Sequence, residues 1–168
     1  VDFDGSPWIE SGTWPLASGS IALDARRDSF GVDGTIVSAA LGEGQLRVQG
    51  AGRWQDSTLE LSSLEAWLPR TSARVSVAGS VRFGEADPVL DLTGEWNNLR
   101  WPLEGEALVD SPLGTLALQG GMPYAFDVQA VAQAPELPRA DFTAAGSLDR
   151  ERVLLDRFDG RLMDGRLR

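Results

Sequence analysis

The chain has 168 residues, of which 42% are hydrophobic, and its formal net charge is -10. This composition is ordinary for one globular domain, or for one section of a longer repetitive protein, and is not typical of a disordered chain. All 15 basic residues are arginine, and an acidic chain without a basic cluster is not expected to bind nucleic acid.

Cysteine and histidine are both absent. Their absence excludes Cys/His metal sites, cysteine nucleophiles, Ser-His-Asp triads and disulfides, and we expect neither a metal ion nor a cofactor. No apolar stretch approaches the ~18 residues that a membrane-spanning helix needs. Val1 begins no signal-like region and is not a methionine, so we expect the sequence to be a segment of a longer protein.

Period-2 alternation of apolar and polar residues dominates the chain and predicts strands with one buried face. In chain order, the alternating runs cover residues 21–24, 45–49, 59–61, 74–83, 90–96, 116–118, 124–128 and 142–148. The phase is ambiguous over 36–41 and 153–158, which are predicted as less regular strands. Only residues 64–68 have a spacing that suits a turn of helix, which Pro69 would end. The chain is therefore predicted to be all-β.

Glycine recurs on the apolar phase of several runs, in the order apolar-x-apolar-x-Gly-x-apolar. Gly79, Gly94, Gly120 and Gly146 occupy this position, and Gly50 stands in a looser copy. Three of them are evenly spaced, since 120 − 94 = 26 and 146 − 120 = 26. A glycine on the inner face relieves crowding where a strand bends, although each glycine alone suits a turn or a bulge equally well. Five in phase favour similar, stacked strands that curve lengthwise into a trough.

The most distinctive run of the sequence is Trp96-Asn97-Asn98-Leu99-Arg100-Trp101-Pro102-Leu103, preceded by Gly94-Glu95. It is followed by Ser111-Pro112-Leu113-Gly114, by residues 120–124, by Glu136-Leu137-Pro138 and by Gly146-Ser147-Leu148. In these residues the chain resembles the TamB family, the large subunit of the translocation and assembly module, and more distantly the AsmA-like periplasmic bridge proteins. The resemblance covers most of residues 34–168 and is vaguer over residues 1–33. Its motifs identify an architecture better than an activity.

The resemblance implies an all-β, elongated, curved (taco-like) stacked sheet with a hydrophobic concave groove. Residues 1–168 would then be a single section of a longer repetitive β-groove protein. That parent protein is expected in the periplasm, anchored in the bacterial inner membrane by a segment absent here. Its expected function is to carry phospholipid acyl chains toward the outer membrane, as part of outer-membrane biogenesis and without catalysis.

The expected groove is lined by the apolar-phase side chains of the alternating runs. These candidates are Leu46, Val48, Val75, Val77, Val81, Phe83, Leu90, Leu92, Trp96, Leu116, Leu118, Phe126, Val128 and Phe142. The alternative for the same residues is a closed core, in which opposing walls touch and no ligand fits.

Two other functions remain open on the sequence. The first is a scaffold that assists the assembly or secretion of outer-membrane β-barrel proteins with a TamA-type partner, by pairing its exposed edge strands. The second is a carbohydrate-binding β-solenoid, which the six tryptophans suggest: Trp8, Trp14, Trp54, Trp67, Trp96 and Trp101. Trp54 and Trp96 share the apolar phase, however, and Trp101 before Pro102 is predicted to be a packed corner.

The carboxylates near the C-terminus do not suggest an active site. Asp149, Asp156, Asp159 and Asp164 alternate with arginines, which is typical of a solvated, charge-balanced surface rather than of an acid/base pair. We therefore expect no enzymatic activity. Open sheet edges at both ends of such a segment favour end-to-end self-association.

Overall fold

A computed structural model of the chain describes residues 2–4, 17–38, 44–84, 87–102, 106–135, 137–162 and 165–167. The regular elements formed by these residues are all strands, joined by turns and short loops. The strands are β1 (Asp2–Asp4), β2 (Ala17–Arg26), β3 (Ser29–Ser38), β4 (Gln45–Gln55), β5 (Thr58–Trp67), β6 (Arg74–Arg82), β7 (Val89–Trp101), β8 (Val109–Gly120), β9 (Tyr124–Ala134), β10 (Leu137–Leu148), β11 (Val153–Leu162) and β12 (Gly165–Leu167). The described part of the chain contains no helix that is long and apolar enough to cross a membrane.

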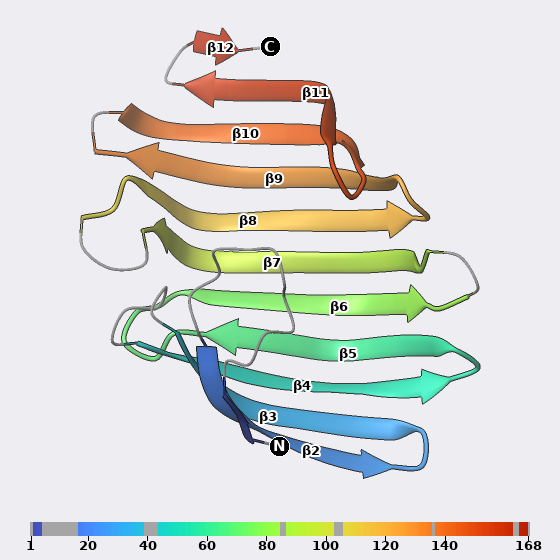
Figure 1. Cartoon of the computed structure of the whole chain (residues 1–168). Coiled ribbons are helices and arrows are strands. Elements are labelled where there is room, and N and C mark those ends of the chain that lie inside the picture. Colours follow the sequence, from blue (N-terminus) through green and yellow to red (C-terminus); the bar gives the residue numbers. More distant parts are fainter. Residues whose placement is uncertain are drawn as a thin grey trace.

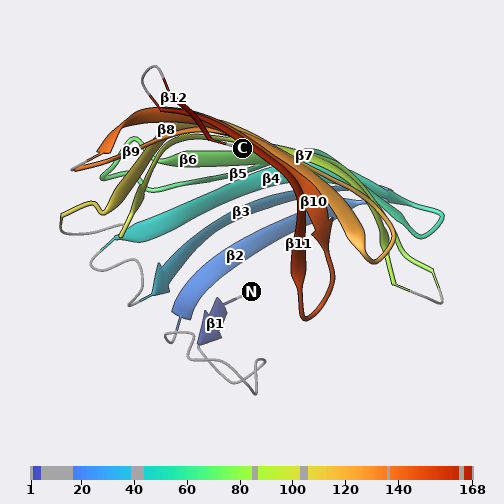
Figure 2. The same ribbon diagram turned by 90° about the horizontal axis from the view of Figure 1, so that it is seen from above.

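All the strands belong to one sheet in which each strand pairs with the next one along the chain (Figure 1). Every pairing is antiparallel, and the ten long strands β2 to β11 are flanked by the three-residue strands β1 and β12. The sheet does not close, and its long strands bend toward one side (Figure 2). The predicted all-β fold of stacked, curved strands is thus confirmed.

The strand registers align the apolar phases of all ten long strands on one face of the sheet, which we call the apolar face. Side chains directly opposite each other in neighbouring strands share a face, so the registers trace rows across the sheet. The first row is Ile21, Gly34, Val48, Ala66, Val75, Trp96, Gly114, Ala130, Phe142 and Gly160. The second row is Leu23, Val32, Gly50, Leu64, Val77, Gly94, Leu116, Val128, Ala144 and Phe158. The third row is Ala25, Phe30, Gly52, Leu61, Gly79, Leu92, Leu118, Phe126, Gly146 and Leu155.

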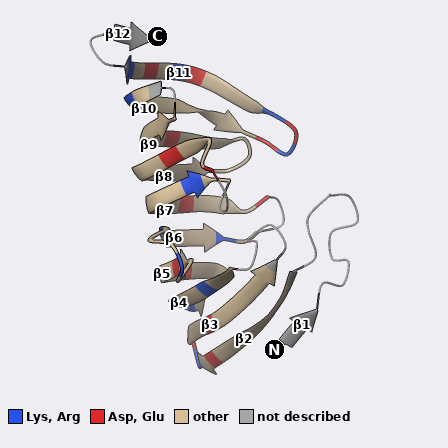
Figure 3. Cartoon of the chain, turned by 90° about the vertical axis from the view of Figure 1, so that its left-hand side faces the viewer, with Lys and Arg blue, Asp and Glu red and all other residues tan. Residues whose placement is uncertain are grey.

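The opposite face, which we call the polar face, carries the charged and hydroxyl side chains of the same strands. One of its rows reads Ala22, Asp33, Gln49, Glu65, Ser76, Glu95, Thr115, Gln129, Thr143 and Asp159. Acidic and basic residues are interspersed along the strands rather than gathered at one end of the sheet (Figure 3). The polar face is therefore a solvated surface.

The described residues form no closed hydrophobic core. The buried apolar residues are few and include small ones: Leu68, Ala73, Ala107, Tyr124, Ala130 and Val131. No large side chain in the described part of the chain is completely buried. Apolar contacts instead run along the apolar face, as in the stacked rings of Phe142 and Phe158, whose centroids are 6.3 Å apart. The closed core with touching walls is thus not formed by these residues, since a single sheet supplies one wall.

The turn of helix suggested for residues 64–68 is wrong, because residues 64–67 lie in β5. The register of β5 shifts between Leu61 and Leu64, and both leucines face the apolar side opposite Gly79 and Val77. The irregularity places apolar residues three apart, which is also the spacing of a helical face. The ambiguous phase over 153–158 has the same cause, since Leu155 and Phe158 of β11 both stand in the apolar rows.

The recurrent glycines all lie on the apolar face, but they differ in local structure. Gly79 and Gly146 adjoin register shifts, and Gly120 ends β8 with a φ of 89° before the next turn. Gly94 lies in the middle of β7 between Val77 and Leu116, in an unbroken register. The turn or bulge interpretation thus holds for three of these four glycines, whereas Gly94 lies within a regular stretch of strand.

The loop between β10 and β11 is ordered by the carboxylate of Asp149 and is tied to a distant loop. Asp149 Oδ1 accepts hydrogen bonds from the backbone N–H groups of Glu151 and Arg152, both at 2.9 Å. The guanidinium of Arg150 forms an ion pair with Asp87, in the loop between β6 and β7. In Figure 1 the loop extends over the end of β9, toward β8 and away from β12.

The two backbone hydrogen bonds, together with the nearby Arg152 guanidinium, hold the pKa of Asp149 below its ordinary value of 3.8. Because the pKa of Asp149 is lower in the folded state than in the unfolded state, its carboxylate stabilises the loop at pH values above the unfolded-state pKa. This stabilisation is lost as the pH falls through the folded-state pKa. We expect the NMR amide signals of Glu151 and Arg152 to titrate together with a midpoint below pH 3.8. In Asp149→Asn this transition should disappear, and a wild-type midpoint at or above 3.8 would contradict the role of the carboxylate.

Candidate functional site

The apolar face brings together all the side chains that the sequence predicted to line a groove. Ten of them stand in the three rows: Val48, Val75, Val77, Leu92, Trp96, Leu116, Leu118, Phe126, Val128 and Phe142. Leu46 pairs with Ile36 in the same phase of β4, and Val81 pairs with Leu90 beside the third row. Phe83 follows β6 and stacks on Trp54, with ring centroids 5.3 Å apart.

Several residues of the same face were not among the predicted candidates. Leu64, Leu155 and Phe158 were missed because register shifts interrupt the period-2 pattern on which the prediction rested. Leu61 was missed although it stands in the alternating run 59–61. Phe30 and Val32 of β3 were also missed, although Phe30, Val32 and Gly34 alternate with Gly31 and Asp33. That alternation was a usable signal in the sequence.

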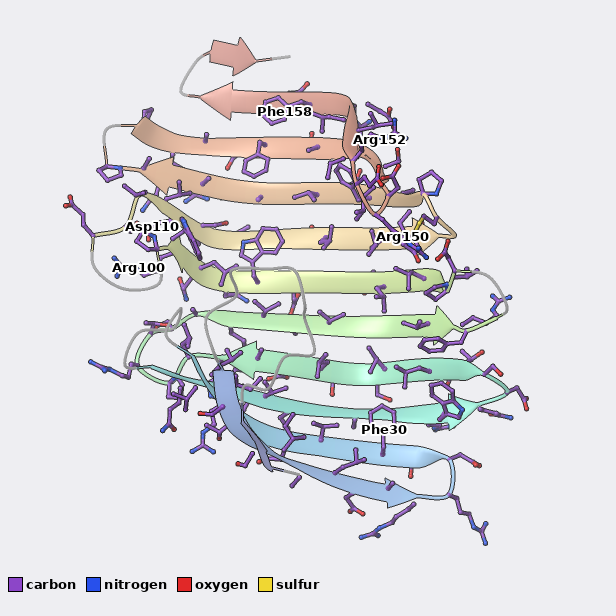
Figure 4. All side chains as sticks on the ribbon, in the orientation of Figure 1. Phe30, Arg100, Asp110, Arg150, Arg152 and Phe158 are labelled. Carbon is purple, nitrogen blue, oxygen red and sulfur yellow. The ribbon has the colours of Figure 1, made fainter. Side chains whose placement is uncertain are left out.

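The apolar face is partly exposed along its whole length. Most of its aliphatic side chains are half-buried by their neighbours, while Leu116 is 37% exposed and Phe158 is 41% exposed. The labelled rings of Phe30 and Phe158 lie at opposite ends of the strand stack and on the same side of the sheet (Figure 4). The face is thus a continuous apolar surface that no second layer of described residues covers.

One polar group is anchored within this face. The indole Nε1–H of Trp96 donates a hydrogen bond to Ser111 Oγ at 2.8 Å, and Ser111 Oγ donates in turn to the carbonyl of Val131 at 2.8 Å. The chain of two bonds satisfies the indole and orients its ring. The ring lies so close over Gly114 that a side chain there would collide with it, since a Cβ at Gly114 would be 2.1 Å from Trp96 Cζ2.

We expect Ser111→Ala to destabilise the sheet, because it leaves the half-buried indole N–H and the Val131 carbonyl without their partner. The expected loss in the free energy of unfolding is about 1–3 kcal/mol, the usual cost of an unsatisfied buried donor. Urea unfolding measures it. Ser76→Ala is the control, since Ser76 Oγ bonds Glu95 in an exposed position and its loss should have almost no effect.

The four tryptophans of the described residues do not form a shared platform for a sugar. Trp101 is 65% exposed, so the predicted packed corner before Pro102 is wrong. Trp54, the other strongly exposed tryptophan, is 49% exposed and lies beside the turn between β4 and β5. Trp101 ends β7 at the opposite rim of the sheet (Figure 1). Trp8 and Trp14 lie outside the described residues.

A shallow hollow of about 400 Å³ on the polar face lies over β8 to β11 and is lined by Leu113, Gln129, Val131, Asp141 and Arg161 among others. Among the described residues, no three carboxylates gather as a metal-ion site would require. Asp149 is engaged in its loop, and Asp164 lies outside the described residues. Neither this hollow nor these carboxylates suggest a better functional site than the apolar face.

Comparison with known proteins found no matching family model, no matching curated protein and no matching solved structure.

Proposed function

We propose that the apolar face lines an open groove that binds the acyl chains of phospholipids and carries them along the stack of strands. The observation that supports this most directly is the composition of the three rows, which cross ten strands without one polar side chain. Soluble proteins rarely leave apolar patches of more than a few hundred Å² uncovered, and larger ones usually bind a partner.

The curvature of the sheet supports a groove rather than a flat surface. The strand ends bend toward one side in Figure 2, and the rings of Phe30 and Phe158 lie on that same side in Figure 4. The apolar face is then the concave one. An extended, flexible and apolar ligand fits such a surface better than a compact polar molecule does.

The dimensions suit a whole lipid. Ten strands at ~4.8 Å spacing give a groove of about 48 Å, longer than the ~30 Å hydrocarbon core of a bilayer. Each methylene that leaves water contributes ~0.8 kcal/mol, so acyl chains bind without specific polar contacts. Binding of this kind permits movement along the groove, because every row offers a similar environment.

The resemblance to the TamB family supports placing this groove in the periplasm, as one section of a bridge toward the outer membrane. In that setting the parent protein, anchored in the inner membrane, would work with a TamA-type barrel. The proposed activity is passive carriage, with no turnover and no cofactor.

Native mass spectrometry of the protein purified from a bacterial envelope, followed by extraction of bound lipid, tests the proposal. We expect one or more phospholipids to co-purify and to exchange with added phospholipid. An apo mass that stays unchanged after incubation with phospholipid vesicles would refute lipid carriage.

A further inference from the structure

One side-chain position on the apolar face is open, because the glycine there is not covered by a neighbour. At most of the other glycines in the rows, a Cβ would lie within 3.1 Å of a neighbouring side chain. These glycines, each with the neighbour that covers it, are Gly34 (Ile21), Gly50 (Leu64), Gly52 (Phe30), Gly114 (Trp96) and Gly146 (Phe126). At Gly94, by contrast, the nearest side-chain atom to a Cβ would be Val77 Cγ2, at 3.7 Å.

Apolar side chains border this open position, which we call the Gly94 gap. Val77 and Leu116 lie directly opposite Gly94 in the neighbouring strands. Leu92 and Trp96 stand two residues before and after it on the same face of β7. The walls of the gap are therefore aliphatic on three sides and aromatic on the fourth, so the group that fits it is a hydrocarbon.

The ring of Trp96, the largest of these neighbours, is held away from the gap. It lies over Gly114 of β8, and its Nε1–H donates a hydrogen bond to Ser111 Oγ at 2.8 Å. Turning the ring over Gly94 would break this bond and leave the indole N–H without its partner, which is unfavourable for a half-buried donor. The Gly94 gap therefore stays open beside a fixed aromatic wall.

We propose that the Gly94 gap accepts the bend of an acyl chain at a cis double bond, so that the groove prefers phospholipids with cis-unsaturated chains. This inference rests on the proposed lipid binding and specifies which lipids bind best. A straight saturated chain lies across the side chains of the rows and spans the gap without filling it. A bent chain lowers one carbon into the gap. Burial of one further methylene, at ~0.8 kcal/mol, corresponds to about fourfold tighter binding.

Competition between matched lipids tests this preference. The wild-type chain is mixed with equal amounts of dioleoyl- and distearoylphosphatidylethanolamine in detergent micelles, and native mass spectrometry gives the ratio of the two bound lipids. These lipids share the headgroup and the chain length, and we expect the cis-unsaturated one to be bound about fourfold more. Dielaidoylphosphatidylethanolamine carries the same double bond in the trans form, which leaves the chain nearly straight. In competition with the saturated lipid it should show no such preference.

Gly94→Ala fills the gap with a methyl group and should abolish the preference, so that the cis-unsaturated and saturated lipids bind in nearly equal amounts. Gly31→Ala is the matched control, because Gly31 lies on the polar face of β3, between Phe30 and Val32 of the apolar rows. A Cβ there would have its nearest neighbour, the carbonyl oxygen of Gly50, at 4.0 Å. This variant should keep the wild-type ratio, and far-UV circular dichroism checks that both variants are folded.

The possible outcomes separate this inference from the proposed function. Equal binding of the cis-unsaturated and saturated lipids by the wild-type chain would overturn the inference and leave the lipid groove standing. A preference that Gly94→Ala retains, or that the trans lipid shares, would also overturn it. The comparison of cis with trans lipid uses the wild-type chain alone and does not depend on the stability of a variant. A wild-type chain that binds none of the three lipids would refute lipid carriage as well.

Discussion

Replacing Leu92 by Asp is expected to abolish the binding of phospholipid while leaving the sheet folded. Leu92 lies in the third row of the apolar face, between Gly79 and Leu118, at the middle of the strand stack. A carboxylate there must lose its hydration when an acyl chain covers it, which costs several kcal/mol. The apparent affinity should fall by at least about tenfold, since each ~1.4 kcal/mol is a factor of ten.

Thr93→Asp is the matched control for this experiment. Thr93 is the next residue of β7, is exposed, and lies on the polar face. It should bind phospholipid like the wild-type chain. Far-UV circular dichroism checks that both variants keep the sheet, and native mass spectrometry counts the bound lipid. Equal lipid binding by both variants would show that the acyl chains do not occupy the apolar face.

The expected survival of Leu92→Asp follows from the way this sheet is stabilised. In a closed core, a buried carboxylate would unfold the protein, because no water could reach it. Leu92 is only half-buried, and no second layer of described residues covers it. The same substitution thus distinguishes the open sheet from the closed core: an open sheet loses its ligand, whereas a closed core loses its fold.

The strands, and the face of the sheet on which each predicted side chain lies, could be predicted from the sequence because apolar and polar residues alternate in it. When one face of a sheet is apolar, the alternation along every strand records the assignment of its residues to faces. Runs such as 74–83 and 90–96 are long enough to fix the phase without knowledge of their partners. The pairing of each strand with the next one in sequence then follows from the short connections.

The register shifts and the exposure of β11, which the sequence did not predict, depend on the identity of the partner strand. The register shift at Leu61 and Leu64 shows only in the pairing of β5 with β6, and in the sequence alone it imitates a helix. The exposure of β11 likewise depends on β12 pairing with only three of its residues. Such properties belong to pairs of strands, and a pattern within a single strand does not contain them.

The recurrent glycines illustrate the same limit. Gly79 and Gly94 occupy equivalent places in the sequence pattern, and they lie close together on adjacent strands, opposite Leu92 and Val77 respectively. Gly79 has a φ of 132°, whereas Gly94 is not among the residues with positive φ. The sequence therefore identifies both as glycines of the apolar face, but only the backbone separates the one that must be glycine from the one that need not be.

We expect Gly79→Ala to destabilise the sheet strongly. A Cβ at this position would lie 2.0 Å from the carbonyl oxygen of Asp91 and 2.9 Å from the Cα of Leu92. Both are backbone atoms of β7, so the collision cannot be relieved by rotating a side chain. The unfavourable φ alone costs on the order of 1–3 kcal/mol. With the collision, the free energy of unfolding should fall by about 3 kcal/mol or more.

Gly94→Ala tests whether this loss is specific to the backbone of Gly79. A Cβ at Gly94 would have its nearest neighbour, the carbonyl oxygen of Ser76, at 3.4 Å, which is ordinary contact. Alanine also restricts the unfolded chain, so its effect on the free energy of unfolding should stay within about 1 kcal/mol of zero. Urea unfolding of the two variants measures the difference. Similar losses for both variants would mean that the apolar face requires the absence of a side chain at each glycine. The curvature of the sheet would then depend on the relief of crowding at every glycine, rather than on the strained backbone of Gly79 beside the register shift.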